Sequence, residues 1–144
     1  MKFYKIYPEV PAFFGDNTKF DRSVIPMLVE KLHIKFDGWL GSDIMELSPI
    51  FYVTQRLGRK LRNTNLSGIA KYDVIESEKS ENFVEIFSDK QIPSCELLRI
   101  NGRPFVDDFG LDKGCLIVSE RANDLLHQFN LSGVDIVEVT SRPT

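Results

Sequence analysis

A 16-residue passage of this chain occurs twice, 65 residues apart, and this duplication limits the folds that the chain can adopt. Residues 53–68 read VTQRLGRKLRNTNLSG, and residues 118–133 read VSERANDLLHQFNLSG. Seven of the 16 aligned positions are identical, namely Val53/Val118, Arg56/Arg121, Leu61/Leu126, Asn65/Asn130, Leu66/Leu131, Ser67/Ser132 and Gly68/Gly133. A repeat on this scale is typical of one supersecondary unit that is used twice. We therefore expect an internal repeat over residues 43–76 and 108–141.

The second copy predicts a strand, a helix and a second strand. Residues 115–118 form a short apolar run, which is typical of a buried strand. Ser119 can cap the following helix, whose apolar residues recur at spacings of three and four: Ala122, Leu125, Leu126 and Phe129. Asn130 and Gly133 tolerate the left-handed backbone that ends a helix, and residues 134–139 return to an extended pattern.

The first copy repeats this scheme, with a strand at residues 50–53, a cap at Thr54 and a closing strand at 71–76. A different interpretation starts the helix at Pro49, because proline suits the first helical position. The duplication argues against it, since Gly114 occupies the equivalent position in the second copy.

Outside the repeat the chain contains mostly strand signals. Residues 12–23 are expected to form a loop. Strands are predicted at 2–7, 31–36, 82–87, 95–100 and 103–106, the last two joined by an Asn101-Gly102 hairpin turn. These elements predict an α+β fold, mainly antiparallel sheet with two short helices from the duplicated strand–helix–strand unit.

The length and composition of the chain suit a single domain over residues 1–144. The net charge of −3 argues against direct binding of nucleic acid by electrostatics. No apolar run approaches the roughly 18 residues of a membrane span, and the N-terminus lacks the apolar core of a signal peptide. We therefore expect a cytoplasmic protein that does not bind membranes.

No motif for catalysis, cofactor binding or metal binding is present in the sequence. His33 and His127 fall on a predicted strand and a predicted helix, where we expect them to face solvent or to be partly packed. An enzyme would have to gather polar groups from distant segments, and Asp107, Asp108 and His127 are the candidates. We expect no enzyme activity, no cofactor and no metal.

The duplication retains the same charged residues and the same glycine in both copies: Asp43, Arg56 and Gly68 in the first, and Asp108, Arg121 and Gly133 in the second. One hypothesis makes each Asp/Arg pair a structural tie between a loop and a helix start. The other makes the two arginines equivalent ligand clamps. Lost stability in an Arg121→Ala variant favours the first, and lost binding at unchanged stability favours the second.

Two segments carry an uneven charge. The first predicted helix holds Arg56, Arg59, Lys60 and Arg62, but the matching helix at 120–129 is not basic, which favours a solvated face over a phosphate site. Residues 76–89 hold five acids against Lys79 alone, namely Glu76, Glu78, Glu81, Glu85 and Asp89. Such a segment can offer carboxylates to a basic partner.

The fuller repeat unit, VSERANDLLHQFNLSGVDIVEV at residues 118–139, resembles a family of bacterial immunity proteins encoded beside polymorphic toxins. Members of this family often show a strand that leads into Ser-x-Lys/Arg, a Leu-rich helix, a Ser-Gly exit and a closing strand near the C-terminus. The likeness covers about the last two thirds of the chain. The positions that match it are expected to be scaffold: Val118, Ser119, Arg121, Leu125, Leu126 and Gly133.

The resemblance implies a small cytosolic toxin inhibitor, as in contact-dependent inhibition. Such a protein binds a cognate toxin domain, blocks its active site or substrate access, and carries no catalysis. The five acids of residues 76–89 are then the expected toxin contacts. The alternative is a small-ligand or nucleic-acid binding module without catalysis, which would use the two repeated arginines or the basic helix.

Overall fold

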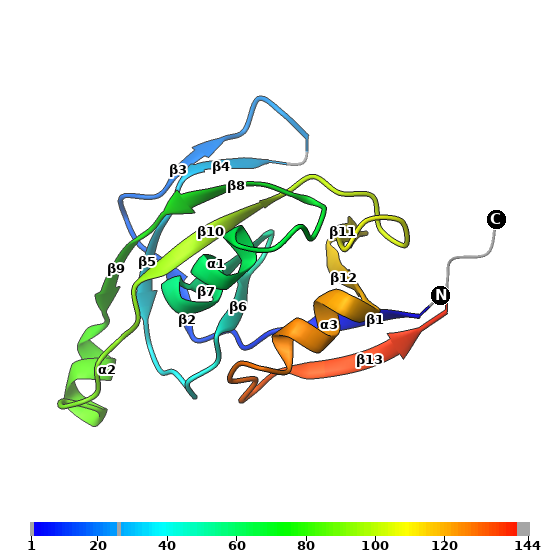
Figure 1. Ribbon diagram of the computed structural model, residues 1–144. Helices are drawn as coiled ribbons and strands as arrows, with labels where there is room; N and C mark the ends of the chain where they lie inside the picture. Colours follow the sequence, from blue (N-terminus) through cyan, green and yellow to red (C-terminus); the bar gives the residue numbers. More distant parts are fainter. Residues whose placement is uncertain (1, 26, 141–144) are drawn as a thin grey trace.

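A computed structural model places residues 2–25 and 27–140 of the chain, to which the structural description refers (Figure 1). The fold is α+β, as predicted, with four sheets and three short helices in these residues. All strand pairings between named strands are antiparallel except the pairing of β5 with β9. None of the helices in the described residues has the length and apolar character needed to cross a membrane.

The two copies of the repeat form two four-stranded sheets with the same strand order. The first has the order β6 (Ile44–Leu47), β7 (Ile50–Thr54), β10 (Cys95–Ile100) and β8 (Ile69–Val74). The second has the order β11 (Phe109–Asp112), β12 (Cys115–Ser119), β1 (Phe3–Tyr7) and β13 (Asp135–Val139). Helix α1 (Gln55–Arg62) follows β7, and α3 (Glu120–Leu126) follows β12. The duplicated passages therefore have the same succession of elements.

The two copies are interleaved. The third strand of each sheet lies outside the copy that supplies the other three: β10 enters the first sheet, and β1 enters the second. Because β1 precedes the first copy along the chain and β10 precedes the second, each copy is preceded by a strand that pairs in the sheet of the other. Figure 1 shows α1 against β7 and β10, and α3 against β12 and β1. Neither sheet can be completed by its own copy alone.

Both helices of the repeat begin at the predicted caps. The Thr54 hydroxyl accepts a hydrogen bond from the Leu57 amide, and the Ser119 hydroxyl accepts one from the Ala122 amide at 3.2 Å. These bonds satisfy amides that a helix leaves free in its first turn. The strand that precedes α1 begins at Ile50, so the interpretation with a helix from Pro49 is wrong. The buried faces of both helices join one hydrophobic cluster: Leu57, Leu61, Ala122, Leu125 and Leu126 pack with Ile6, Val53, Phe109 and Val118, among others.

The remaining elements pack against the first sheet and share a second hydrophobic cluster with it. Strands β2 (Ala12–Phe14), β5 (His33–Phe36) and β9 (Glu76–Lys79) pair in that order, and β3 (Lys19–Asp21) pairs with β4 (Leu28–Lys31) as an arm. Helix α2 (Glu81–Ile86) follows β9 and lies at one end of the molecule (Figure 1). The second cluster contains Ile34, Phe36, Tyr52, Phe83 and Leu97.

Residues 82–86 lie in α2 and Phe87 caps its end, so the predicted strand at 82–87 is wrong. The apolar content of this segment favoured a strand, but a capping residue precedes it. The Ser80 hydroxyl accepts from the Phe83 amide at 3.0 Å and donates to Asp37 at 2.7 Å, which fixes a helix start. Only Phe83 is buried within the helix, so no second apolar position has to face the core.

The predicted strand at residues 103–106 is also wrong, and no Asn101-Gly102 hairpin forms. The amides of Asn101 and Gly102 donate to the Gly68 carbonyl at 2.9 and 3.1 Å, and so they bind the exit loop of the first copy. The Asp107 amide donates to the Arg103 carbonyl at 2.9 Å, which closes a turn where a strand was expected.

Other boundaries differ from the predictions. The expected loop at residues 12–23 contains the short strands β2 and β3. The predicted strand at 31–36 is interrupted at Leu32, whose side chain is buried between the ends of β4 and β5. The predicted closing strand at 71–76 ends at Val74, after which the chain passes to a different sheet as β9. The strand at 2–7 is confirmed over Phe3–Tyr7.

Candidate functional site

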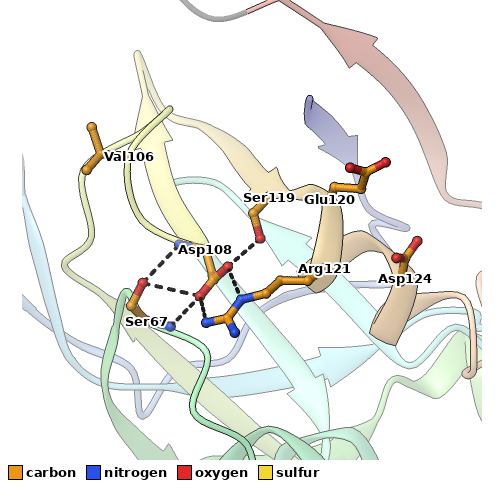
Figure 2. A pocket seen from close by; sticks show the side chains of 7 residues that line it. All are labelled: Ser67, Val106, Asp108, Ser119, Glu120, Arg121 and Asp124. Atoms are coloured by element: carbon orange, nitrogen blue, oxygen red, sulfur yellow. Dashed lines mark hydrogen bonds and ion pairs between the residues drawn. The ribbon is translucent and has the colours of Figure 1, made fainter. Parts of the chain in front are cut away.

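The repeated Asp108 precedes β11, is buried to 7% exposure, and directs its side chain to the start of α3 (Figure 2). Its Oδ1 accepts from the Ser119 hydroxyl at 2.5 Å and from Arg121 Nε at 3.0 Å. Its Oδ2 accepts from Arg121 Nη2 at 2.8 Å, from the Ser67 amide at 2.9 Å and from the Ser67 hydroxyl at 3.3 Å. Arg121 is the main cause that holds the pKa of Asp108 well below its usual range, with Ser119 and Ser67 adding to it and burial opposing it.

Asp43 is bound in the same way at the start of α1. Its Oδ1 accepts from the Thr54 hydroxyl at 2.6 Å, and its carboxylate forms a two-atom ion pair with Arg56. Its Oδ2 also accepts from the Asn130 amide at 2.8 Å. Both ion pairs that the duplication suggested are therefore formed within the chain.

Each of these carboxylates ties the two copies together. Ser67 belongs to the exit loop of the first copy and binds Asp108, whereas Asn130 belongs to the exit loop of the second copy and binds Asp43. Backbone hydrogen bonds reinforce both crossings, from the Phe109 amide to the Ser67 carbonyl at 3.0 Å and from the Asp43 amide to the Asn130 carbonyl at 2.8 Å. The Asp/Arg pairs thus join a helix start in one copy to the exit loop of the other.

The two glycines of the repeat differ in how closely the other parts of the chain approach them. Gly68 has a φ of +108°, and a Cβ there would lie 2.1 Å from the Phe109 carbonyl oxygen, which is backbone. Gly133 has a φ of +74°, but the nearest atom to its Cβ position is the flexible Leu40 Cδ1 at 2.8 Å. The first copy therefore depends more strictly on glycine than the second.

A hollow lies beside each Asp/Arg pair, and the two hollows differ in charge. The hollow at Asp108 is lined by Ser67, Val106, Ser119, Glu120, Arg121 and Asp124 (Figure 2). The hollow at Asp43 is lined by Trp39, Thr54, Gln55, Arg56, Arg59, Pro93 and Ser94. Positions equivalent by the repeat are Glu120 and Gln55, and Asp124 and Arg59. The Asp108 hollow has Glu120 and Asp124 where the Asp43 hollow has Gln55 and Arg59. The two hollows would therefore not favour the same ligand.

Two arginines of the basic helix, Arg56 and Arg62, have partners within the chain. Arg62 forms an ion pair with Glu96 and lies over the Tyr72 ring, with 5.3 Å to the centroid. Arg56 lies over the Phe129 ring at 5.0 Å in addition to its pairing with Asp43. The candidates for an enzyme site do not converge: the Asp107 carboxylate accepts from the Arg103 amide, whereas His127 Nδ1 lies 2.8 Å from the Asn123 carbonyl at the end of α3.

His33 is buried to 2% exposure, so the expectation of a solvent-facing or partly packed histidine is wrong for this residue. The loop after β2 covers it: a Cβ at Gly15 would lie 2.1 Å from His33 Nδ1, so only glycine allows this approach. His33 Nε2 lies 2.5 Å from the Glu78 carboxylate and 3.6 Å from that of Glu76.

These three side chains could hold a metal ion by distance, but the histidine is turned the wrong way for one. The Asn17 amide donates to His33 Nδ1 at 3.1 Å, so Nδ1 is an acceptor and the ring proton belongs on Nε2, facing Glu78. A histidine that binds metal through Nε2 normally keeps its proton on Nδ1 and donates it. The cluster is therefore a hydrogen-bonded contact between β5 and β9.

The five acids of residues 76–89 fall into two groups. Glu76 and Glu78 lie on β9 and contact basic groups of the neighbouring strands, with Lys31 3.7 Å from Glu76 and Lys35 4.0 Å from Glu78. All five acids are exposed, and the other three lie on or just after α2: Glu81, Glu85 and Asp89. Exposed apolar residues lie between them, namely Val84, Ile86 and Phe87, which the sequence had suggested for a strand.

Comparisons of the chain with protein families, with curated proteins and with solved structures found no match. The function is therefore inferred from this chain's own residues and contacts.

Proposed function

We propose that this protein is an immunity protein that binds a cognate bacterial toxin domain and neutralises it by covering its active site. The observation that carries the proposal is the exposed group of acids at α2: Glu81, Glu85 and Asp89. The neighbouring acids Glu76 and Glu78 face lysines and His33 within the chain. The α2 group is thus directed outward, where a partner can meet it.

The rest of the chain supports a macromolecular partner over a small ligand. The two Asp/Arg pairs, which offered the best candidates for a ligand clamp, hold the copies together through their own hydrogen bonds. Their carboxylate oxygens already accept several donors each, and their hollows differ in charge. The motif positions that resemble immunity proteins fall on the same scaffold.

An acidic surface suits a toxin partner for an electrostatic reason. Toxin domains that act on nucleic acid need a basic surface, and an inhibitor that presents carboxylates meets that surface with the field of the substrate. Charge complementarity of this kind accelerates association and selects against wrong partners.

The alternative is a small-ligand or nucleic-acid binding module. The hollow at Asp43 is its best location, because Trp39, Arg56 and Arg59 combine an aromatic ring with positive charge there. The internal pairing of Arg56 with Asp43 weakens this alternative. Saturable binding of an oligonucleotide in a gel shift, abolished by Arg59→Ala, would favour it.

The proposal is tested with the reading frame beside the gene for this protein. Its C-terminal domain is expressed alone in a bacterial host, then with this protein, and growth is measured. We expect the domain to arrest growth, this protein to restore growth, and the two chains to co-purify. Arrest that persists at equal expression, with no complex on size exclusion, would contradict the proposal.

A further inference from the structure

Helix α2 presents a mixed acidic and apolar face to solvent. Successive residues of an α-helix are about 100° apart. Glu81 and Glu85 are one turn apart and lie on the side opposite the buried Phe83. Val84 and Ile86 fall on the two flanks of these acids, with exposed fractions of 50% and 62%. Apolar side chains on both flanks of an acidic ridge are more than a solvated helix needs.

This segment is held firmly to the body of the protein. Phe83 is fully buried, and its ring packs against Phe87 with centroids 5.4 Å apart. Ser80 ties the start of the helix to Asp37. The Lys90 ammonium donates to the Trp39 carbonyl and lies 5.5 Å from the Phe87 ring centroid, so it is directed back toward the protein. A surface fixed before binding loses little conformational entropy on docking.

We propose that the α2 segment, residues 80–90, is the docking element of this protein, and that its partner presents a groove with lysines and arginines at its floor and apolar walls on both sides. This inference rests on the proposed function and names the surface and partner chemistry for it. Val84 and Ile86 each contact one apolar wall of the groove, where burial of apolar side chains supplies most of the affinity. Glu81, Glu85 and Asp89 face the lysines and arginines at the floor of the groove and set the association rate.

The charges of the α2 segment indicate that the partner's surface is positively charged. Three carboxylates are exposed along residues 81–89, whereas the single cation of the segment, Lys90, bonds the Trp39 carbonyl. The two acids on β9 differ, because Lys31, Lys35 and His33 contact them. Of the five acids expected to contact the toxin, we therefore retain the three on the α2 segment.

The arm formed by β3 and β4 offers an apolar comparison. Its Ile25 is 98% exposed, but no acidic ridge accompanies it as one does on α2. Val24 beside it is 44% exposed, so V24S/I25S is a matched control for the two apolar changes in α2. For the charges, Glu30, Asp124 and Glu138 are exposed on β4, α3 and β13, so reversing all three gives the same change in net charge elsewhere.

The test measures association and dissociation rates with the toxin domain of the neighbouring reading frame at about 20 mM and about 200 mM NaCl. The wild type is compared with a triple variant E81K/E85K/D89K, a double variant V84S/I86S and the two controls. We expect the triple variant to associate at least about tenfold more slowly at low salt and to lose most of its salt dependence. We expect the double variant to dissociate at least about tenfold faster.

Circular dichroism melts verify that each variant is folded. Should the triple lysine variant fail to fold, E81Q/E85Q/D89N takes its place, and we expect a smaller change in the same direction. A wild type that does not bind overturns the proposed function and this inference together. A wild type that binds, with both α2 variants behaving like their controls, overturns this inference alone and leaves the proposed function standing.

Discussion

Replacing Asp108 with Asn should destabilise the protein measurably, because this carboxylate joins the two copies of the repeat. Its two oxygens accept five hydrogen bonds, from Ser119, Arg121 and Ser67. The asparagine side chain has the same shape as the aspartate, but it keeps only one acceptor oxygen. Its NH₂ group takes the place of the other oxygen and points at groups that donate hydrogen bonds. The Asp108→Asn variant therefore loses the negative charge, and at least one hydrogen-bond donor lies opposite another donor.

The size of the effect follows from these contacts. A buried hydrogen bond to a charged group contributes about 1.5–3 kcal/mol. The Arg121 side chain is 57% exposed, so solvent reduces the value of the ion pair, and the buried contacts with Ser119 and Ser67 count most. We expect a loss of about 2 kcal/mol in the free energy of unfolding, which corresponds to a fall of about 6 °C in Tm for a chain of this length.

Urea and thermal unfolding, followed by circular dichroism, measure this loss. The pKa of Asp108 is lower in the folded state than in the unfolded state, so its contribution is fully present above about pH 4 and declines as the pH falls toward the folded-state pKa. The stability gap between wild type and Asp108→Asn should therefore be constant near neutral pH and narrow below about pH 4. An unchanged Tm at pH 7, or a gap that widens on acidification, would refute the structural role of this pair.

Other predictions concern the scaffold. Gly68→Ala should cost about 3 kcal/mol or more, because its Cβ would strike the Phe109 carbonyl. Gly133→Ala should cost about 1–2 kcal/mol, because the positive φ strains any side chain there while the nearest atoms belong to the Leu40 and Glu9 side chains, which can move. Chemical denaturation measures both losses, and equal losses would contradict this difference. Phe83→Ala should cost about 3–4 kcal/mol in the same assay, since it empties the buried site that anchors α2, and a change below about 1 kcal/mol would contradict that anchoring. Burial raises the pKa of the Cys95 thiol to about 12, so a thiol reagent should modify partly exposed Cys115 in the native protein and Cys95 only after unfolding; equal rates for both would be inconsistent with this structure.

The elements predicted correctly are those encoded by neighbouring residues. The caps Thr54 and Ser119 and the apolar spacing after them lie within one segment, so the sequence alone defines both helices. Helix α2 also has a local cap, Ser80, but its apolar and β-forming residues obscured that signal. The exchange of β1 and β10 between the two sheets was not predictable, because the choice of a strand's partner depends on the whole fold.

In the candidate site, too, the sequence predicted the features that recur in the repeat and missed those that depend on the whole fold. The duplication identified both Asp/Arg pairs, because their residues recur at a fixed offset. The contributions of Ser67 and Asn130 were missed, since each comes from the opposite copy. The burial of His33 depends on a loop some 18 residues earlier in the chain, where Gly15 leaves the space that the ring fills.

Hydrogen exchange of the wild-type protein, measured with and without the toxin domain of the neighbouring reading frame, shows whether the α2 segment is the surface that docks. We expect the amides of residues 80–90 to exchange more slowly on binding, while the amides at the starts of α1 and α3 exchange as in the free protein. Protection at the Arg56 or Arg121 hollows, with none at α2, would contradict this expectation.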